Sequence, residues 1–390
     1  MLTDTEIENL VIPIIRRQKK FNYDVLSIIG NRVRVIANSK PDDVYKLKQY
    51  LNTDNDVRLI NSLEIDGLIA VFTAIEAFCY TVAEDAYKSA KSNYFNSNKP
   101  FIRFANNQNM QKATEEITSS ITNKYRNAMS NVSIRLAVPG VPRVKNTYNL
   151  ADGYREIVNR SLSALQLDSA NFYPQIRDTI RNLVSEGIRF KLNTDDKRSF
   201  TQRTETFLHN LLLDGVKSIN QKINERIAIE TNTNGVEISV HEYPAPDHEL
   251  IQGHQFTNEQ FENLQSGMDF KDIDGNEFEG IERAIGEWNC RHFTTSIIVG
   301  MTEPQYSNEE LQSIISRNHK GLTLSNGTHL TLYQCNQVQR EYKDDLAKLE
   351  TGVDLAKTIG DTELLSFYNA RYTQKLGEYK TFLGMLSKQS

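Results

Sequence analysis

Apolar residues in the first half of the chain recur three and four positions apart, which is the spacing of one face of an α-helix. The most apolar stretch runs from Leu68 to Val82 and predicts a buried helix, with Cys79 as a small apolar residue on its packed face. Glu76 interrupts this stretch, so it falls short of the roughly 20 apolar residues that a membrane span needs. We therefore predict a mainly helical region over residues 1–198 and no membrane contact.

The pattern changes after residue 198. The turn Asn234-Gly235 leads into alternating apolar positions up to Val240, which predict a half-buried strand. A second strand is expected over residues 293–299. Together these features predict a small α+β domain over residues 199–336.

Two further units are expected near the end of this domain. Ser307 and Glu310 have the spacing of a capping box, which predicts the start of a helix. Residues 322–332 predict a β-hairpin around Asn326-Gly327. We expect this hairpin to close the sheet of the α+β domain.

Residues 337–390 predict an antiparallel helical hairpin. Leucines and tyrosines repeat at alternating spacings of four and three positions on both sides of Gly360-Asp361, where the pattern breaks. We expect this apolar seam to pack on itself, with the docking of another protein as the alternative. The predicted fold class is therefore mainly α with a small α+β domain.

Composition is consistent with two or three domains, because 390 residues at 39% hydrophobic content can bury substantial cores. The three cysteines, Cys79, Cys290 and Cys335, are too scattered for a disulfide framework, which favours folding in a reducing interior such as a bacterial cytoplasm. Residues 1–9 carry acidic side chains and no basic one, so we expect no signal peptide.

Polar and aromatic residues that are rare elsewhere are concentrated between His241 and Pro304. This segment holds four of the seven histidines and the only tryptophan. These residues, together with a neighbouring cysteine, are His241, His248, His254, His292, Trp288 and Cys290. Pro244 and Pro246 exclude regular strand pairing, so the loop between them and His248 should be rigid and extended. Rigid loops of this kind often carry function.

Three interpretations of this segment are open. A metal site would recruit ligands from His248, His254, Cys290 and His292. A catalytic pair would use Cys290 as the nucleophile, a histidine such as His248 or His292 as the base and Asp247 to orient that base. The third is a buried polar network in which Asp247, Trp288, Arg291 and the histidines bond to backbone groups. We favour the network and expect no cofactor, with zinc as the alternative.

Several established motifs are absent from the sequence. His241-Glu242 and His248-Glu249 begin like a zincin helix, but neither has a second histidine four positions on. The segment Asp272-Ile273-Asp274-Gly275 lacks the outer acidic ligands of a calcium loop and predicts a turn. No phosphate loop, dinucleotide fingerprint or nucleophile elbow is present.

A basic segment lies between residues 117 and 151, which contain no acidic residue. Its cations are Lys124, Arg126, Arg135, Arg143 and Lys145. We favour an ordinary solvated segment, because the chain as a whole has a net charge of -5. The alternative is local contact with packaged DNA phosphates or with an acidic partner.

Short polar segments between His241 and Pro304 resemble the signature of the phage minor capsid protein 2 family, a branch of the Mu F-like head-morphogenesis proteins. The residues that carry the resemblance are Pro246, Asp247, His248, Gln252, Gly253, Gly286, Trp288, Asn289, Cys290, Arg291, His292, Glu303 and Pro304. The similarity extends to Tyr333, Gln337, Gln339, Arg340 and Glu341 and is specific over residues 200–390.

The resemblance implies a minor head component of a tailed phage or prophage. Such a protein would be present in few copies in the virion, inside the capsid, with the portal or the major capsid protein as partner and packaged DNA as a local contact. It would assemble in the bacterial host cytoplasm and act in head morphogenesis or DNA delivery. The alternative is a hydrolase-like or toxin-like enzyme, with or without a metal ion, whose activity would reside in the signature itself, because the chain ends directly after the helical hairpin. We expect no enzyme activity.

Overall fold

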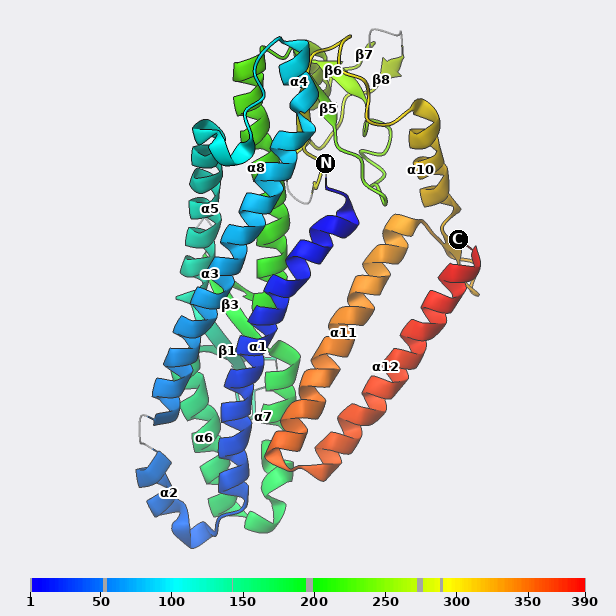
Figure 1. Ribbon diagram of the computed structural model, residues 1–390. Coiled ribbons are helices and arrows are strands. Elements are labelled where there is room, and N and C mark those ends of the chain that lie inside the picture. Colours follow the sequence, from blue (N-terminus) through cyan, green and yellow to red (C-terminus); the bar gives the residue numbers. More distant parts are fainter. Residues whose placement is uncertain are drawn as a thin grey trace.

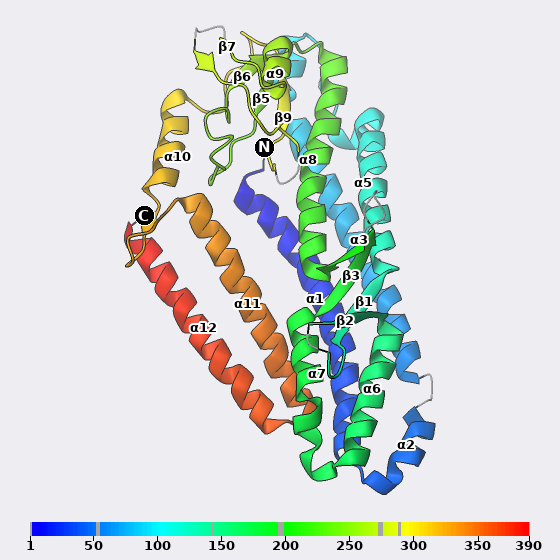
Figure 2. The same cartoon turned by 180° about the vertical axis from the view of Figure 1, so that it is seen from behind.

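A computed structural model describes residues 2–51, 55–141, 143–193, 199–271, 276–287 and 290–389. Long helices form an elongated bundle, and a small α+β region lies at one end of it (Figure 1). The same view from behind places the last two helices along one side of the bundle (Figure 2). The predicted fold class is confirmed, since helices dominate and the sheets are small and antiparallel.

The bundle is built on four long helices that contact one another: α1 (Asp4–Ala37), α3 (Asn55–Ser89), α5 (Gln108–Met129) and α8 (Thr204–Thr231). A capping box between Thr3 and Glu6 fixes the start of α1. Short helical segments complete this half: η1 (Pro41–Asp43), α2 (Val44–Leu51), α4 (Lys91–Asn96) and η2 (Phe104–Asn106). The predicted helical N-terminal half is thus observed.

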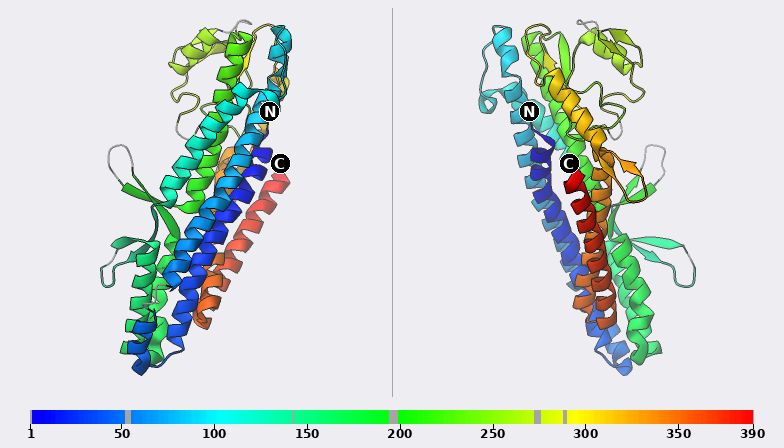
Figure 3. Two further views of the ribbon diagram at one scale, coloured as in Figure 1. Left: turned by 60° about the vertical axis from the view of Figure 1, so that its left-hand side comes forward. Right: turned by 90° about the vertical axis from the view of Figure 1, so that its right-hand side faces the viewer.

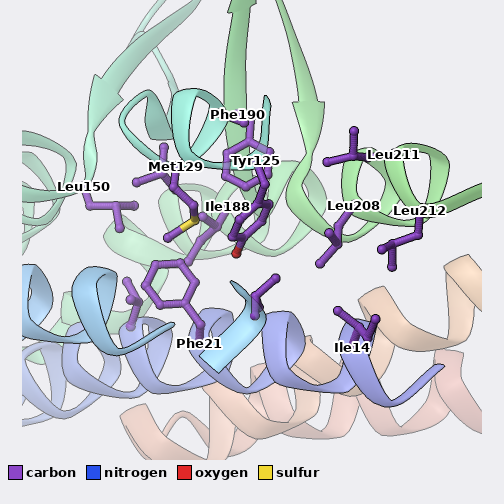
Figure 4. Packing of buried hydrophobic residues seen from close by; sticks show 14 of the residues in the cluster. Ile14, Phe21, Tyr125, Met129, Leu150, Ile188, Phe190, Leu208, Leu211 and Leu212 are labelled. Atoms are coloured by element: carbon purple, nitrogen blue, oxygen red, sulfur yellow. The ribbon is translucent and has the colours of Figure 1, made fainter. Parts of the chain in front are cut away.

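Buried side chains from distant segments meet in the middle of the bundle. Phe21 of α1, Tyr125 of α5 and Phe190 point toward one another between the helices and the neighbouring sheet (Figure 4). Tyr125 is fully buried, and its hydroxyl donates a hydrogen bond of 2.5 Å to the side chain of Gln18. Because this buried hydroxyl has a hydrogen-bond partner, the fold avoids the cost of about 1–3 kcal/mol for an unpaired polar group in a core.

The helix predicted around Leu68 to Val82 is part of α3, and its predicted face is buried at Val71, Ile75, Phe78, Cys79 and Val82. By length and composition alone the helical run 55–96 could cross a membrane, a test that buried core helices also pass. In the bundle, α3 packs against α1, α5 and α8.

A four-stranded antiparallel sheet lies against the bundle, in the order β2-β1-β3-β4. Its strands are β1 (Val132–Ala137), β2 (Lys145–Asn149), β3 (Ile188–Asn193) and β4 (Ser199–Arg203). Helices α6 (Leu150–Leu167) and α7 (Phe172–Glu186), with η3 (Ser169–Asn171) between them, connect the two hairpins. Both hairpins project from the side of the bundle (Figure 3). This sheet was not predicted, because its strands lie among helical segments and their alternation is short.

The α+β region contains a three-stranded antiparallel sheet in the order β6-β5-β9. The strands of this sheet are β5 (Gly235–Ile238), β6 (Gln255–Thr257) and β9 (Thr294–Ile297). The region also contains α9 (Asn258–Gln265) and a separate pair of strands, β7 (Phe270–Lys271) and β8 (Glu277–Phe278). The strand after the Asn234-Gly235 turn and the strand near residues 293–299 are both confirmed, although each is shorter than expected. The turn predicted at Asp272–Gly275 lies outside the described residues.

The capping box of Ser307 and Glu310 begins α10 (Asn308–Lys320), as predicted. The hairpin β10 (Leu322–Thr323) and β11 (His329–Leu330) also forms. The prediction that this hairpin closes the sheet of the α+β region is wrong, because in the described residues β10 and β11 pair only with each other. Their core is a separate cluster around Leu322, Cys335 and Phe382.

The C-terminal helical hairpin is confirmed as α11 (Leu332–Ile359) and α12 (Thr362–Gln389). Gly360 ends α11 with φ at +86°, a left-handed conformation that glycine adopts without strain. Gly352 lets the two helices approach, since a Cβ there would lie 2.6 Å from the ring of Tyr368. The hairpin packs on the bundle through α1 and α7.

One buried ion pair fixes the hairpin to the bundle. The Arg177 guanidinium of α7 donates hydrogen bonds of 2.8 and 3.0 Å to the Asp361 carboxylate, which is 3% exposed. The same carboxylate accepts the backbone N–H groups of Glu363 and Leu364 at the start of α12. Burial by itself would raise the pKa of Asp361, but the hydrogen bond from Arg177 and these amides hold it below its ordinary value.

We expect Asp361→Ala to lower the free energy of unfolding by about 3 kcal/mol, because Arg177 loses its buried partner and keeps only the exposed Glu363, and the first amides of α12 lose their cap. Urea denaturation followed by circular dichroism measures the difference. Asp178→Ala is the matched control, since Asp178 forms an exposed pair with Arg181 and its removal should leave the midpoint unchanged. Equal midpoints for wild type and Asp361→Ala would contradict the assigned role.

The pH dependence of this difference has a defined sign. Because the folded pKa of Asp361 is lowered, its contribution is complete above the ordinary carboxyl pKa of about 3.9 and is lost as the pH falls through the folded value. The gap between wild type and Asp361→Ala should therefore shrink in acid. A gap that widens in acid would contradict this assignment.

Candidate functional site

Two neighbouring strands bring the predicted site residues together. β5 and β9 pair antiparallel, so the chain leaving β5 and the chain entering β9 lie side by side. Ser239 after β5 exchanges hydrogen bonds with Phe293 before β9, of 2.9 Å from its N–H and 3.1 Å to its hydroxyl. The loop that carries His248 therefore faces the segment that carries Cys290 and His292.

Gln252 and Gly253 hold the loop after β5 in place. The side-chain oxygen of Gln252 accepts the N–H of His241 at 2.9 Å, and the N–H of Gly253 donates to the carbonyl of Ile238. Gly253 has φ at +75°, and a Cβ there would lie 2.4 Å from the side chain of Leu311. Both constraints require glycine, which explains this part of the signature.

β9 is itself fixed by Ser296, whose polar groups are all bound by helices of the bundle. Its N–H and hydroxyl donate to Asn224 of α8, at 3.1 and 3.0 Å, and its carbonyl accepts from Asn93 of α4 at 2.5 Å. All three residues are buried. The end of β9 that carries the site is thus positioned by the bundle.

His248, Cys290 and His292 form a compact buried group, which we call the His/Cys cluster. The Sγ atom of Cys290 lies 3.6 Å from Nδ1 of His248 and 3.8 Å from Nδ1 of His292. Their exposed fractions are 1%, 4% and 3% in chain order. One potential ligand atom from each residue lies within 4.8 Å of the others.

The His248 ring has a defined orientation. Its Nε2 donates a 2.7 Å hydrogen bond to the carbonyl of Arg283, which leaves Nδ1 directed at Cys290. Asp247 does not take this role, because its nearer oxygen is 3.8 Å from Nε2 and pairs at 2.6 Å with the Arg283 guanidinium. In the described structure the His248 ring is therefore oriented by the Arg283 carbonyl and not by Asp247, as the catalytic interpretation had expected.

The cluster perturbs the ionisation of its members. Burial by itself would raise the pKa of the Cys290 thiol, but His248 and backbone groups of Gly286 and His292 lower it below its ordinary value. Burial works against the charged form of His248 as well, yet the contacts with Cys290 and the Arg283 carbonyl raise its pKa. Burial and the neighbouring histidines lower the pKa of His292, which is therefore neutral.

His241 extends the cluster toward the N-terminus. Its Nδ1 lies 2.8 Å from the Asp4 carboxylate at the start of α1, and its ring is 4.4 Å from that of His292. Within the described residues, the buried Nε2 atoms of His241 and His292 have no hydrogen-bond partner. Buried imidazole nitrogens without a protein partner are suited to bind a polar ligand or water.

A cavity of about 110 Å³ adjoins the cluster. Its walls come from the start of α1, the loops of the α+β region and the first turns of α11. In Figure 1 the first turns of α1 and of α11 both point toward the α+β region. Polar groups lining it include Asp4, His241, Arg283, Arg291, His292 and Arg340. The site is therefore a junction of three parts of the fold.

Some predicted residues lie elsewhere. His254 packs with its ring 5.1 Å from that of Phe278 and is not in the His/Cys cluster, so the four-residue metal set is not assembled in the described structure. Glu303 and Pro304 are exposed beyond β9. Trp288 and Asn289 lie outside the described residues, and the structure therefore leaves their predicted roles untested.

The basic segment is partly neutralised within the fold. Lys145 and Arg135 both pair with Glu186 of α7, and Arg126 lies 4.9 Å above the ring of Phe72. Lys124 and Arg143 are exposed. These contacts give three of the five cations a structural explanation.

Two residues of the junction, Asp4 and Arg283, could not be predicted from the sequence. Asp4 is far from the signature in the chain, and no local pattern marks it. Arg283 contributes through its carbonyl as well as its side chain, and a backbone role leaves no trace in residue type. The α11 residues Tyr333, Gln337 and Arg340 did carry a signal, since they belong to the family resemblance.

The fold and site define a mainly helical protein with a buried His/Cys junction in a small α+β region. The family model described as phage minor capsid protein 2 matches residues 28–384. The chain therefore belongs to the phage minor capsid protein 2 family and is a phage minor capsid protein. The match confirms the resemblance and extends it into the N-terminal half. No curated protein and no solved structure matches the chain.

We expect chelator-washed native protein to react with iodoacetamide first at Cys290. The other two cysteines are buried in cores, and burial raises the pKa of Cys79 to about 11 and that of Cys335 as well, whereas Cys290 lines the cavity and has a lowered pKa. Peptide mass spectrometry of briefly labelled protein measures the order. Earlier labelling of Cys79 or Cys335 would contradict this description.

Proposed function

We propose that the protein is a low-copy component of the phage head, located inside the capsid at the portal and acting in head assembly or DNA delivery. Membership of the minor capsid family supports this proposal more than any other observation. The partners proposed are the portal and major capsid proteins, and assembly takes place in the host cytoplasm.

The shape of the molecule is consistent with such a role. The bundle is elongated, and the helical hairpin α11–α12 runs along its side with α12 outermost (Figure 2). On α3, Ile65 and Ile69 are 59% and 58% exposed and lie one helical turn apart. Exposed apolar side chains on a long rigid helix suit a protein that packs against other head proteins.

The proposal predicts that the protein is retained in mature particles at a low ratio to the major capsid protein. Mass spectrometry of gradient-purified particles, before and after a high-salt wash, measures the ratio against the portal and major capsid proteins. A stable ratio near that of the portal is expected. Loss of the protein from washed particles, with abundant protein in the lysate, would overturn the virion assignment.

An enzyme remains a second candidate, because Cys290 and His248 have the separation and shifted pKa values of a thiolate–imidazolium pair. Phage complementation with Cys290→Ser separates the two functions. A structural role predicts lower incorporation of the variant into particles, together with lower infectivity. Wild-type incorporation with lost infectivity would favour catalysis. Cys335→Ser, in a different buried cluster, is the control for a general effect of cysteine replacement.

A further inference from the structure

We propose that the His/Cys cluster is a zinc site in which His248, Cys290 and His292 are the protein ligands. The inference rests first on the spacing of the three side chains. Around a tetrahedral zinc ion, bond lengths of about 2.3 Å to sulfur and 2.0 Å to nitrogen put the two atoms about 3.5 Å apart. The observed separations from Cys290 Sγ to the two Nδ1 atoms are 3.6 and 3.8 Å.

The surroundings of His248 support the same assignment. A zinc-bound imidazole usually donates its other N–H to a carbonyl or carboxylate, which fixes the ring and directs the free nitrogen at the metal. The Nε2 of His248 donates in this way to the Arg283 carbonyl at 2.7 Å. The Asp247–Arg283 ion pair beside it holds the residue that supplies this carbonyl.

His292 is the third protein ligand, through the Nδ1 atom that lies 3.8 Å from Cys290 Sγ. The side chain is 3% exposed, and its Nε2 has no hydrogen-bond partner in the part of the chain that the structure describes. An unpaired buried polar atom costs about 1–3 kcal/mol. With Nδ1 bound to the metal, Nε2 would carry the ring proton and would donate it to a water molecule in the cavity that His292 lines.

The open side of the cluster faces the cavity. Cys290 and His292 line the cavity with His241, whose Nε2 is also buried without a partner among the described residues. About 110 Å³ is enough for water, and a water molecule in the fourth metal position would provide a partner for this nitrogen. One sulfur and two imidazole ligands favour zinc over magnesium or calcium, which prefer oxygen.

The small size of the local core gives the metal a structural role. The α+β region is held by a cluster of six buried apolar residues: Ile238, Ile251, Phe256, Leu264, Phe278 and Ile281. Small cores are often supplemented by a metal, whose binding free energy adds to folding. The ligands would add a cross-link between the loop after β5 and the segment that carries Cys290 and His292.

Metal analysis of the full chain tests the inference. The protein is purified without chelator and its zinc measured by elemental analysis, with about one ion per chain expected. It is then stripped with a chelator and titrated with Co²⁺, which should produce the visible absorption of a tetrahedral site and the near-ultraviolet band of a cobalt–thiolate bond. Bound metal should also protect Cys290 from alkylation.

Ligand variants give the matched comparison. In Cys290→Ala and His292→Ala the affinity for Co²⁺ should fall by more than about 100-fold. Replacing residues that only orient the ligands already lowers metal affinity by roughly 10–100-fold. His254→Ala and Cys335→Ala, which change a histidine of the same region and a cysteine of another core, should bind as wild type does.

The result that overturns the inference does not depend on the variants. Folded wild-type protein that contains no zinc and shows no cobalt–thiolate band after titration would exclude the site. Equal loss of binding in the His254→Ala control would also exclude it. Neither result bears on the presence of the protein in the virion, so this inference and the proposed function fail separately.

Discussion

The hydrogen bonds of Ser296 are the constraint on which the site depends. A buried strand residue needs partners for its N–H, carbonyl and hydroxyl, and Ser296 finds all of them on helices of the bundle. Asn224 can serve in this way because its own side-chain amide is oriented by the carbonyl of Asn220 in the same helix. The strand cannot shift along the bundle without leaving several buried polar groups unpaired, and Cys290 and His292 are therefore held close to their observed positions.

The site joins parts of the chain that are far apart in sequence. Asp4 comes from the first turn of α1, the histidines from the α+β region, and Arg340 from α11. At the opposite end of the hairpin, Arg177 and Asp361 tie α12 to α7. The helical hairpin is thus attached to the rest of the molecule at both ends, one attachment lying beside the cavity.

The arrangement of charge also limits what the site can do. The acidic groups of the junction, Asp4 and Asp247, are engaged by His241 and Arg283, and Arg291 lies near Arg340, which lowers the pKa of Arg291 after the larger effect of burial. A cavity lined by Arg283, Arg291 and Arg340 favours a neutral or anionic occupant on its open side. Cys290 differs from the other two cysteines. Its thiol has a lowered pKa, whereas the pKa values of Cys79 and Cys335 are raised, so Cys290 is the one best suited to bind a metal ion or to react.

Much of the fold could be predicted from the sequence, because helices are specified by local spacing. The helix around Val71 to Val82, the capping box of Ser307 and Glu310 and the hairpin break at Gly360 all depend on residues within a few positions of one another. The family could be identified for a related reason, since its signature lies in short strings. The side-chain chemistry of the site was also visible there, as a concentration of histidines around Cys290.

The tertiary structure alone decided which of these residues meet. The central pairing of the four-stranded sheet, β1 with β3, joins strands that are separated by α6 and α7, and no local pattern reports such pairing. Likewise, His248 and His292 reach Cys290 while His254 packs on Phe278, although all three histidines looked equally competent as ligands. Residue type determines what a side chain can bind. Its neighbours in space are determined by strand register and by the packing of distant helices, which only the folded chain specifies.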